Sequence, residues 1–135
     1  MTSAFVFDTN ALISAHILPN SASREAFDKG NSLGILIYST ATMHEFATVF
    51  MRPKFDRYQS TEARLSMIAA FEKRSQLITI TQQVSASRDS TDYMFLELAL
   101  SCPTKAIITG DPHLLTLHPF RGIPIINAAT FLSSF

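Results

Sequence analysis

Five short apolar runs, separated by longer helix-forming stretches, constrain the fold of this chain more than any other feature. Such runs are typical of strands buried on both faces, and strands that alternate with helices predict a mainly parallel sheet. The expected strands are Ala4–Phe7, Gly34–Tyr38, Leu77–Thr81, Lys105–Thr109 and Pro124–Asn127. The expected helices are 10–17, 21–29 (with Gly30 as a cap), 40–51, 61–74, 87–100 (helical after Asp89), 111–117 and 128–135. We therefore expect an α/β fold.

The length and composition fit one compact unit. The chain has 135 residues, of which 47% are hydrophobic and 16% charged, so it can build a core and is not expected to be disordered. Eleven basic residues balance eleven acidic ones, which excludes a strongly cationic nucleic-acid coat but allows a local basic patch. Because no stretch has the composition of a linker, we expect a single domain over residues 1–135.

The sequence gives no indication of secretion or membrane insertion. The single cysteine, Cys102, cannot form an internal disulfide. No apolar run approaches the roughly 20 residues that span a bilayer, and the first residues reach an aspartate too early for a signal peptide. We therefore expect a cytoplasmic protein without a membrane segment.

Two aspartates directly follow expected strands. Asp8 follows the first strand, and Asp111 follows the fourth strand after Gly110, which we expect to permit a tight turn. Ligands of parallel sheets bind beyond the carboxyl ends of the strands, so both side chains are candidates for a site. Each could equally be the N-cap of the next helix, and Pro112 after Asp111 fits that structural interpretation.

Three further acidic residues lie on or at the start of helices. Glu45 falls mid-helix at the edge of an apolar face, where a carboxylate needs a cation, a hydrogen-bond donor or a proton. Its structural alternative is pairing with Arg52 or turning out to solvent. Asp89 and Asp92 lie three apart at a helix start and so on one side of it. Both could stabilise the helix dipole, but with Asp89 as the cap, Asp92 lies closer to the crevice.

Together these positions predict a site for a divalent cation. If the sheet is parallel and the first strand is central, Asp8, Glu45, Asp92 and Asp111 converge. Converged carboxylates repel one another unless a cation is bound or some take up protons. An all-oxygen site favours Mg²⁺ or Mn²⁺, and the lack of a cysteine cluster or a spaced histidine pair argues against zinc.

Four segments give the chain a family likeness. They are VFDTN (6–10), HEF (44–46), RDSTDYMFLELA (88–99) and ITGDPHLL (108–115). In this order and spacing the chain resembles a PIN-domain nuclease of the VapC type, the toxins of type II toxin–antitoxin modules. The resemblance implies a three-layer α/β/α sandwich with a five-stranded sheet.

The resemblance also implies an activity and a set of residues. It implies an endoribonuclease in which Asp8, Glu45, Asp92 and Asp111 bind Mg²⁺ or Mn²⁺, and the cation activates water against the phosphodiester. Supporting positions are Thr9, Asn10, Asp89 and Thr109, with Asp89 a cap or an outer partner of the site. The implied partners are an RNA substrate, an antitoxin protein and a second copy of the chain.

A basic segment is the candidate RNA contact. Residues 52–74 carry six basic and three acidic side chains on an otherwise neutral chain. Phosphates require such cations, and aromatic side chains can stack on bases. We take Arg52, Lys54 and Arg57 as RNA-binding candidates, while a solvated helix face is the simpler interpretation of any one of them.

Two other functions remain open from the residues alone. A Mg²⁺-dependent phosphatase could use Asp8 as its nucleophile, but the position of its second acid holds Asn10. A non-catalytic or degenerate PIN-like binding domain is also possible, although all four acidic positions are filled. A phosphate-sensing receiver is disfavoured because no lysine accompanies the last strand.

Overall fold

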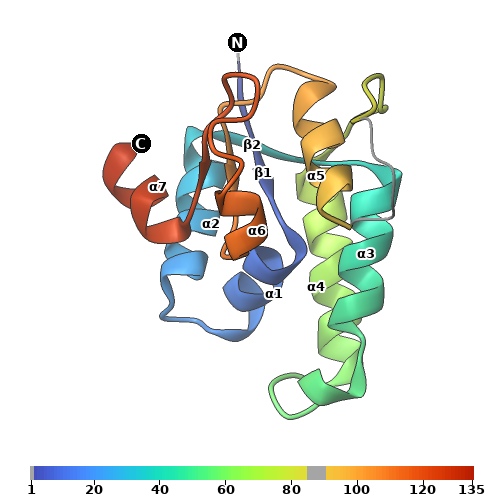
Figure 1. Ribbon diagram of the computed structural model, residues 1–135. Coiled ribbons are helices and arrows are strands. Elements are labelled where there is room, and N and C mark those ends of the chain that lie inside the picture. The colour runs from blue at the N-terminus through green and yellow to red at the C-terminus, as the bar shows by residue number, and fades with distance from the viewer. Residues whose placement is uncertain (1, 85–90) are drawn as a thin grey trace.

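The computed structural model describes residues 2–84 and 91–135, and Figure 1 shows their arrangement. The strands are β1 (Ser3–Phe7), β2 (Gly34–Tyr38), β3 (Gln76–Leu77), β4 (Ala106–Ile108) and β5 (Ile125–Ile126). The helices are α1 (Thr9–Ile17), α2 (Ala22–Leu33), α3 (Thr40–Phe50), α4 (Thr61–Arg74), α5 (Thr91–Leu100), α6 (Pro112–Leu115), α7 (Ala128–Ser134) and a 3₁₀ turn, η1 (Pro53–Phe55). No helix in these ranges is long and apolar enough to cross a bilayer.

The five strands form one parallel sheet in the order β3-β2-β1-β4-β5, which confirms the predicted fold class. The first strand is central, because Phe5 pairs with Leu36 of β2 on one side and with Ala106 of β4 on the other. Since the strands are parallel, the carboxyl ends of β1 and β4 lie side by side at one edge of the sheet. The chain continues from these ends into Asp8 and Thr109.

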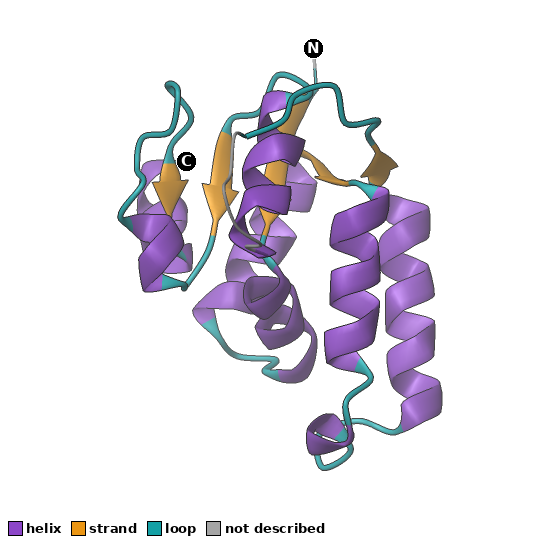
Figure 2. Ribbon diagram, turned by 45° about the vertical axis from the view of Figure 1, so that its right-hand side comes forward, coloured by secondary structure: helices purple, strands orange, loops and turns teal. Residues whose placement is uncertain are grey.

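Alternate residues of β1, β2 and β4 are buried on opposite faces of the sheet. Phe5 and Phe7 pack in a core with side chains of α1, α2, α3 and α7. Ala4 and Val6 pack on the other face with apolar residues of α5 and with Leu114 of α6. Figure 2 shows the sheet between these helices. The double burial explains why the strands appear in the sequence as unbroken apolar runs.

Helices α3 and α4 lie side by side and extend beyond the sheet, with η1 at their far end (Figures 1 and 2). Arg64 of α4 holds this end together and is 0% exposed. Its guanidinium donates hydrogen bonds to the carbonyls of Phe50 (2.7 Å) and Arg52 (3.1 Å), and forms an ion pair with Asp56. Arg64 was counted among the cations of the basic segment, and its burial removes it from any RNA-facing surface.

Strand β3 is shorter than the predicted 77–81. After Leu77, the amide of Ile78 still donates to the carbonyl of Tyr38 (2.8 Å), but β2 ends there and α3 begins. Further along, the amide of Val84 donates to Glu97 of α5 (3.1 Å) and the amide of Thr81 donates to Ser101, which follows α5 (3.0 Å). The apolar run therefore leaves the sheet after Ile78, where β2 offers no further partner.

Of the two glycines around the start of β2, Gly30 was expected to cap a helix and Gly34 to begin a strand. Gly30 does not end its helix, because α2 continues to Leu33, and a side chain at position 30 would press on Leu36. Gly34 is the residue that the fold requires. A Cβ there would lie 1.9 Å from the carbonyl oxygen of Ser3, so β1 and β2 can approach closely only without it.

Candidate active site

Asp8 follows β1 and its side chain is held on two sides. One carboxylate oxygen accepts a hydrogen bond from the amide of Ala11 (2.9 Å) and caps α1, and the other accepts one from the hydroxyl of Thr109. Asp8 is only 4% exposed. The interpretation of Asp8 as an N-cap is therefore correct. The capping carboxylate still lies at the carboxyl edge of the sheet, where a site was expected.

Thr109 connects Asp8 to Asp111. Its buried hydroxyl, which donates to Asp8, also accepts a hydrogen bond from the amide of Asp111 (2.9 Å). Asp111 in turn accepts one from the amide of His113 (2.9 Å) and caps the short helix α6. Gly110, between Thr109 and Asp111, has open space where a Cβ would lie and no positive φ, so the backbone here does not require a glycine.

The structure places the four candidate acids around one cavity, which we call the acid cavity. It has a volume of about 210 Å³, and its lining consists of Asp8, Thr9, Asn10, Glu45, Val49, Arg52, Asp92, Phe95 and Asp111. The acids come from four separate segments: the start of α1, the middle of α3, the first turn of α5 and the start of α6. Asp89 lies outside the described residues.

Burial and mutual repulsion act on the carboxylates of the acid cavity. Burial raises the pKa of Asp8 to about 6, the hydrogen bonds from Thr109 and Ala11 oppose the rise, and the charges of Asp111 and Asp92 add to it. The pKa of Asp92 is also raised, first by burial and then by its contact with Asp111. Arg52 is the only cationic residue among the described residues that line the cavity. Negative charge is therefore crowded here at neutral pH, which is the condition that a bound cation relieves.

The chemistry of the acid cavity fits a hard divalent cation. Its candidate donors are all oxygens, which suits Mg²⁺ or Mn²⁺. The hydroxyl oxygen of Thr9 is buried in this lining and has no hydrogen-bond partner among the described residues, so it is available to a ligand or to ordered water. Within the described ranges, no three His, Cys, Asp or Glu side chains already form a metal centre. The acids line the cavity without meeting at a single point.

Two apolar side chains, Val49 and Phe95, form walls of the acid cavity; the sequence predicted an apolar face beside Glu45 but not these two residues as walls of a site. Val49 lies four residues after Glu45 on α3, and Phe95 lies three residues after Asp92 on α5. Each therefore lies on the same helix face as an acid. That spacing was the available signal, since an apolar residue beside each acid indicates a face turned partly to the interior. These walls reduce the exposure of the carboxylates to water.

The three RNA-binding candidates are exposed. Arg52 lines the acid cavity, whereas Lys54 and Arg57 lie at the far end of the α3–α4 pair. The Lys54 ammonium lies 5.1 Å from the Phe55 ring centroid, and the Arg57 guanidinium lies 5.3 Å from that of Tyr58. These two cations thus lie over aromatic rings at a surface that leads away from the acids.

The chain matches a protein-family model in sequence and is similar to solved structures in fold. A sequence model of the PIN domain matches residues 4–113. No curated protein matches at a significant level. The crystal structure of VapBC2 from Rickettsia felis bound to promoter DNA contains a similar chain, with a TM-score of 0.61 and 10% identity over 92% of this chain and 98% of that one. The crystal structure of DNA-bound VapBC from Salmonella typhimurium contains another similar chain, with a TM-score of 0.57 and 18% identity over 95% of this chain and 99% of that one. At these identities the two structures share the fold.

Proposed function

The chain belongs to the PIN domain family, and from that premise we propose that it is a Mg²⁺- or Mn²⁺-dependent endoribonuclease that hydrolyses RNA phosphodiesters. The observation that carries the proposal is the acid cavity, in which carboxylates from four distant segments face one space. Structural roles explain Asp8 and Asp111 as caps, but no cap explains Glu45 in the middle of α3. A buried aspartate surrounded by half-buried acids is costly unless the set serves a bound cation.

Each acidic side chain has a role in the proposed reaction. Asp8, Asp92 and Asp111 would hold the cation, and Glu45 would either join them or orient the attacking water. When bound, the cation supplies a Lewis acid for the phosphoryl group and lowers the pKa of water. Thr109 keeps the Asp8 carboxylate turned toward the cavity through its hydrogen bond. Val49 and Phe95 limit access of bulk water.

The exposed cations give the RNA a path to the acid cavity. Arg52 in its lining is placed to contact a phosphate beside the scissile bond. Lys54 and Arg57 extend the positive surface along the end of the α3–α4 pair, where phosphate contacts supply affinity without sequence information.

We also propose that the nuclease is the toxin of a toxin–antitoxin module, with an antitoxin protein and a second copy of the chain as its partners. The support is the VapC-like sequence pattern and the fold shared with two VapBC structures. Induced expression should arrest cell growth, and co-expression of an adjacent small reading frame should relieve the arrest. An arrest that Asp8→Asn also causes would contradict a toxin role based on cleavage.

The direct test of the nuclease is RNA cleavage by the purified chain. With Mg²⁺ or Mn²⁺ the wild type should cleave RNA, and Asp8→Asn should reduce cleavage to background. Asp28→Asn is the matched control, because Asp28 is an exposed aspartate of α2 that pairs with Arg24. Equal cleavage by the wild type and Asp8→Asn would mean that the activity is a contaminant.

A binding measurement tests the metal ligands separately from activity. Mn²⁺ should raise the melting temperature of the wild type, because a ligand that binds only the folded state stabilises it. The rise should shrink in Asp92→Asn and in Asp111→Asn and remain in Asp28→Asn. An unchanged rise in either cavity variant would remove that residue from the proposed ligand set.

A further inference from the structure

A second cavity adjoins the acid cavity and has a different chemistry. Its volume is about 260 Å³, and it lies between α1, α2, the end of β4 and the start of α7. Asn10 lines both cavities, and Thr109, which donates to Asp8, lines this one as well. The two cavities therefore share a wall at Asn10. We call it the neutral cavity.

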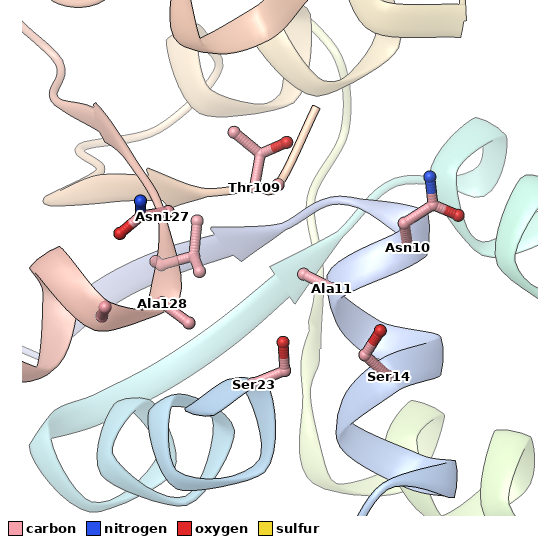
Figure 3. Close-up of a pocket in the computed structure, with 10 residues that line it drawn as sticks. Asn10, Ala11, Ser14, Ser23, Thr109, Asn127 and Ala128 are labelled. Atoms are coloured by element: carbon pink, nitrogen blue, oxygen red, sulfur yellow. The ribbon is translucent and has the colours of Figure 1, made fainter. Parts of the chain in front are cut away.

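Small polar side chains face the neutral cavity from three directions. Figure 3 shows Ser14 of α1 and Ser23 of α2 on one side, with Thr109 and Asn127 across from them. Within the described part of the chain, the side chains of Asn10, Ser14 and Ser23 make no hydrogen bond. The side-chain oxygen of Asn127 accepts a hydrogen bond from the backbone amide of Thr130 (2.8 Å) and so caps α7. The side-chain NH₂ group of Asn127 remains as a donor. The neutral cavity thus presents several uncommitted donors and acceptors.

The described residues that line the neutral cavity carry no charge. Beside its polar residues, the wall is apolar, with Ala11, Ile108 and Ala128 among its members. A phosphate would find no cation here, so this is not a second phosphate site. Apolar walls with amide and hydroxyl groups suit an unstacked nucleobase, which presents apolar faces and a hydrogen-bonding edge.

We propose that the neutral cavity binds one nucleobase of the RNA beside the scissile phosphodiester and contributes to base selection. The inference rests on the proposed nuclease function for its substrate, and on the shared wall at Asn10 for its position. Asparagine amides pair with base edges through a donor and an acceptor together. Asn10 and Asn127 border the space that a base would occupy, and the two serine hydroxyls can adapt as donor or acceptor.

Base-dependent binding tests the inference without requiring cleavage. Short 2′-O-methyl homopolymers of A, C, G and U are titrated against the protein and followed by fluorescence anisotropy. The wild type should bind one base at least about fivefold more tightly than the weakest, because the groups of the cavity pair with only some base edges. Ser23→Leu, which fills the cavity, should reduce that preference to below about twofold.

Matched variants separate the cavity from general effects. Ser32→Leu introduces the same side chain at an exposed position of the same helix and should keep the preference. The double variant Ser14→Ala with Ser23→Ala removes both hydroxyls without adding bulk, so it covers the case in which Ser23→Leu fails to fold. It should lower the preference at least about threefold. Equal binding of all four homopolymers by the wild type, or a preference that survives in the filled variant, would overturn the inference.

Cleavage of unmodified RNA by the same proteins distinguishes the two proposals. If Ser23→Leu loses the base preference and the wild type shows metal-dependent cleavage, both proposals are supported. Cleavage with a base preference that Ser23→Leu leaves unchanged overturns the base site and leaves the nuclease intact. Base-dependent binding that the filled variant loses, without any cleavage by the wild type, overturns the nuclease and supports the neutral cavity as a base-binding site.

Discussion

The hydroxyl of Thr109 donates a hydrogen bond to the carboxylate of Asp8, although the two residues are 101 positions apart in the chain. The contact exists because β4 pairs directly with β1, so the ends of these strands meet. The same hydroxyl accepts a hydrogen bond from the amide of Asp111 (2.9 Å). One threonine side chain thus fixes the relative positions of two acids, and it is itself 1% exposed.

Thr109→Val should impair the site while keeping the fold, because valine has nearly the same shape without the hydroxyl. The hydrogen bond lowers the pKa of Asp8, so its loss should raise that pKa further. The acid limb of the pH–rate profile should then move to higher pH, and Mn²⁺ affinity should fall about 10–100-fold, as for other outer partners of metal ligands. Thr109→Ser retains the hydroxyl and should stay near the wild type. Identical profiles for the valine and serine variants would show that the hydrogen bond does not tune the site.

The raised pKa of Asp8 predicts how the metal-free protein responds to pH. The folded state holds a proton on Asp8 up to about pH 6, whereas the unfolded chain loses it near 3.8. Between these values the folded state binds more protons, so the free energy of unfolding should fall as pH rises, by about 3 kcal/mol for this group. Below 3.8 the stabilisation is fully present, and above about 6 it is lost.

Asp8→Asn should remove that pH dependence. The amide keeps an oxygen for the Ala11 cap and carries no charge, so at neutral pH the metal-free variant should be more stable than the wild type by about 1–3 kcal/mol. Urea unfolding across this pH range, with a chelator present, measures both effects. Because the pKa of Asp92 is also raised, the free energy of unfolding of Asp8→Asn should still fall as pH rises, with a smaller slope than in the wild type. A variant less stable than the wild type at neutral pH would contradict the assigned cost of the Asp8 charge.

The sequence was sufficient to predict the sheet and the positions of the acids, because both depend on local patterns. Runs such as 34–38 are apolar on both faces, and the structure buries alternate residues of the strands on opposite sides. Asp8 and Asp111 follow strands in the chain, so a parallel sheet brings them to one edge. Glu45 could be singled out because no cap explained it, and the helix that carries it is placed by the apolar residues beside it.

Features that depend on distant partners could not be predicted. Arg64 falls within the basic segment 52–74, whereas the structure buries it against the carbonyls of Phe50, at the end of α3, and of Arg52, in the turn that follows. The apolar run after Leu77 lost its strand partner where β2 ends, which the run itself does not indicate. The neutral cavity is lined by serines and asparagines from segments over 100 residues apart, and of these residues only Asn10 belongs to a motif.

Lys54 and Arg57 should contribute to RNA affinity and not to the chemical step. Both are exposed at the end of the α3–α4 pair, away from the acids. Replacing both by alanine should weaken RNA binding several-fold at low salt, with a smaller effect at high salt, while kcat stays near the wild-type value. Lys73→Ala with Arg74→Ala removes the same charge from the opposite end of α4. If the two double variants weaken binding equally, net charge and not a local contact determines the affinity.

Arg64→Met should destabilise the α3–α4 pair more than any exposed charge of α4. The last carbonyls of a helix have no partner within it, and at the end of α3 the Arg64 guanidinium supplies one to Phe50 and another to Arg52 in the following turn. Methionine fills the space but leaves these buried oxygens and the Asp56 carboxylate without their donor. The expected loss is about 2–4 kcal/mol in the free energy of unfolding, measured with urea. Arg74→Met on the same helix is exposed and should change it by less than about 0.5 kcal/mol. A similarly small loss in Arg64→Met would mean that water satisfies these groups, and the turn that places Arg52 beside the acids would then not depend on the buried guanidinium.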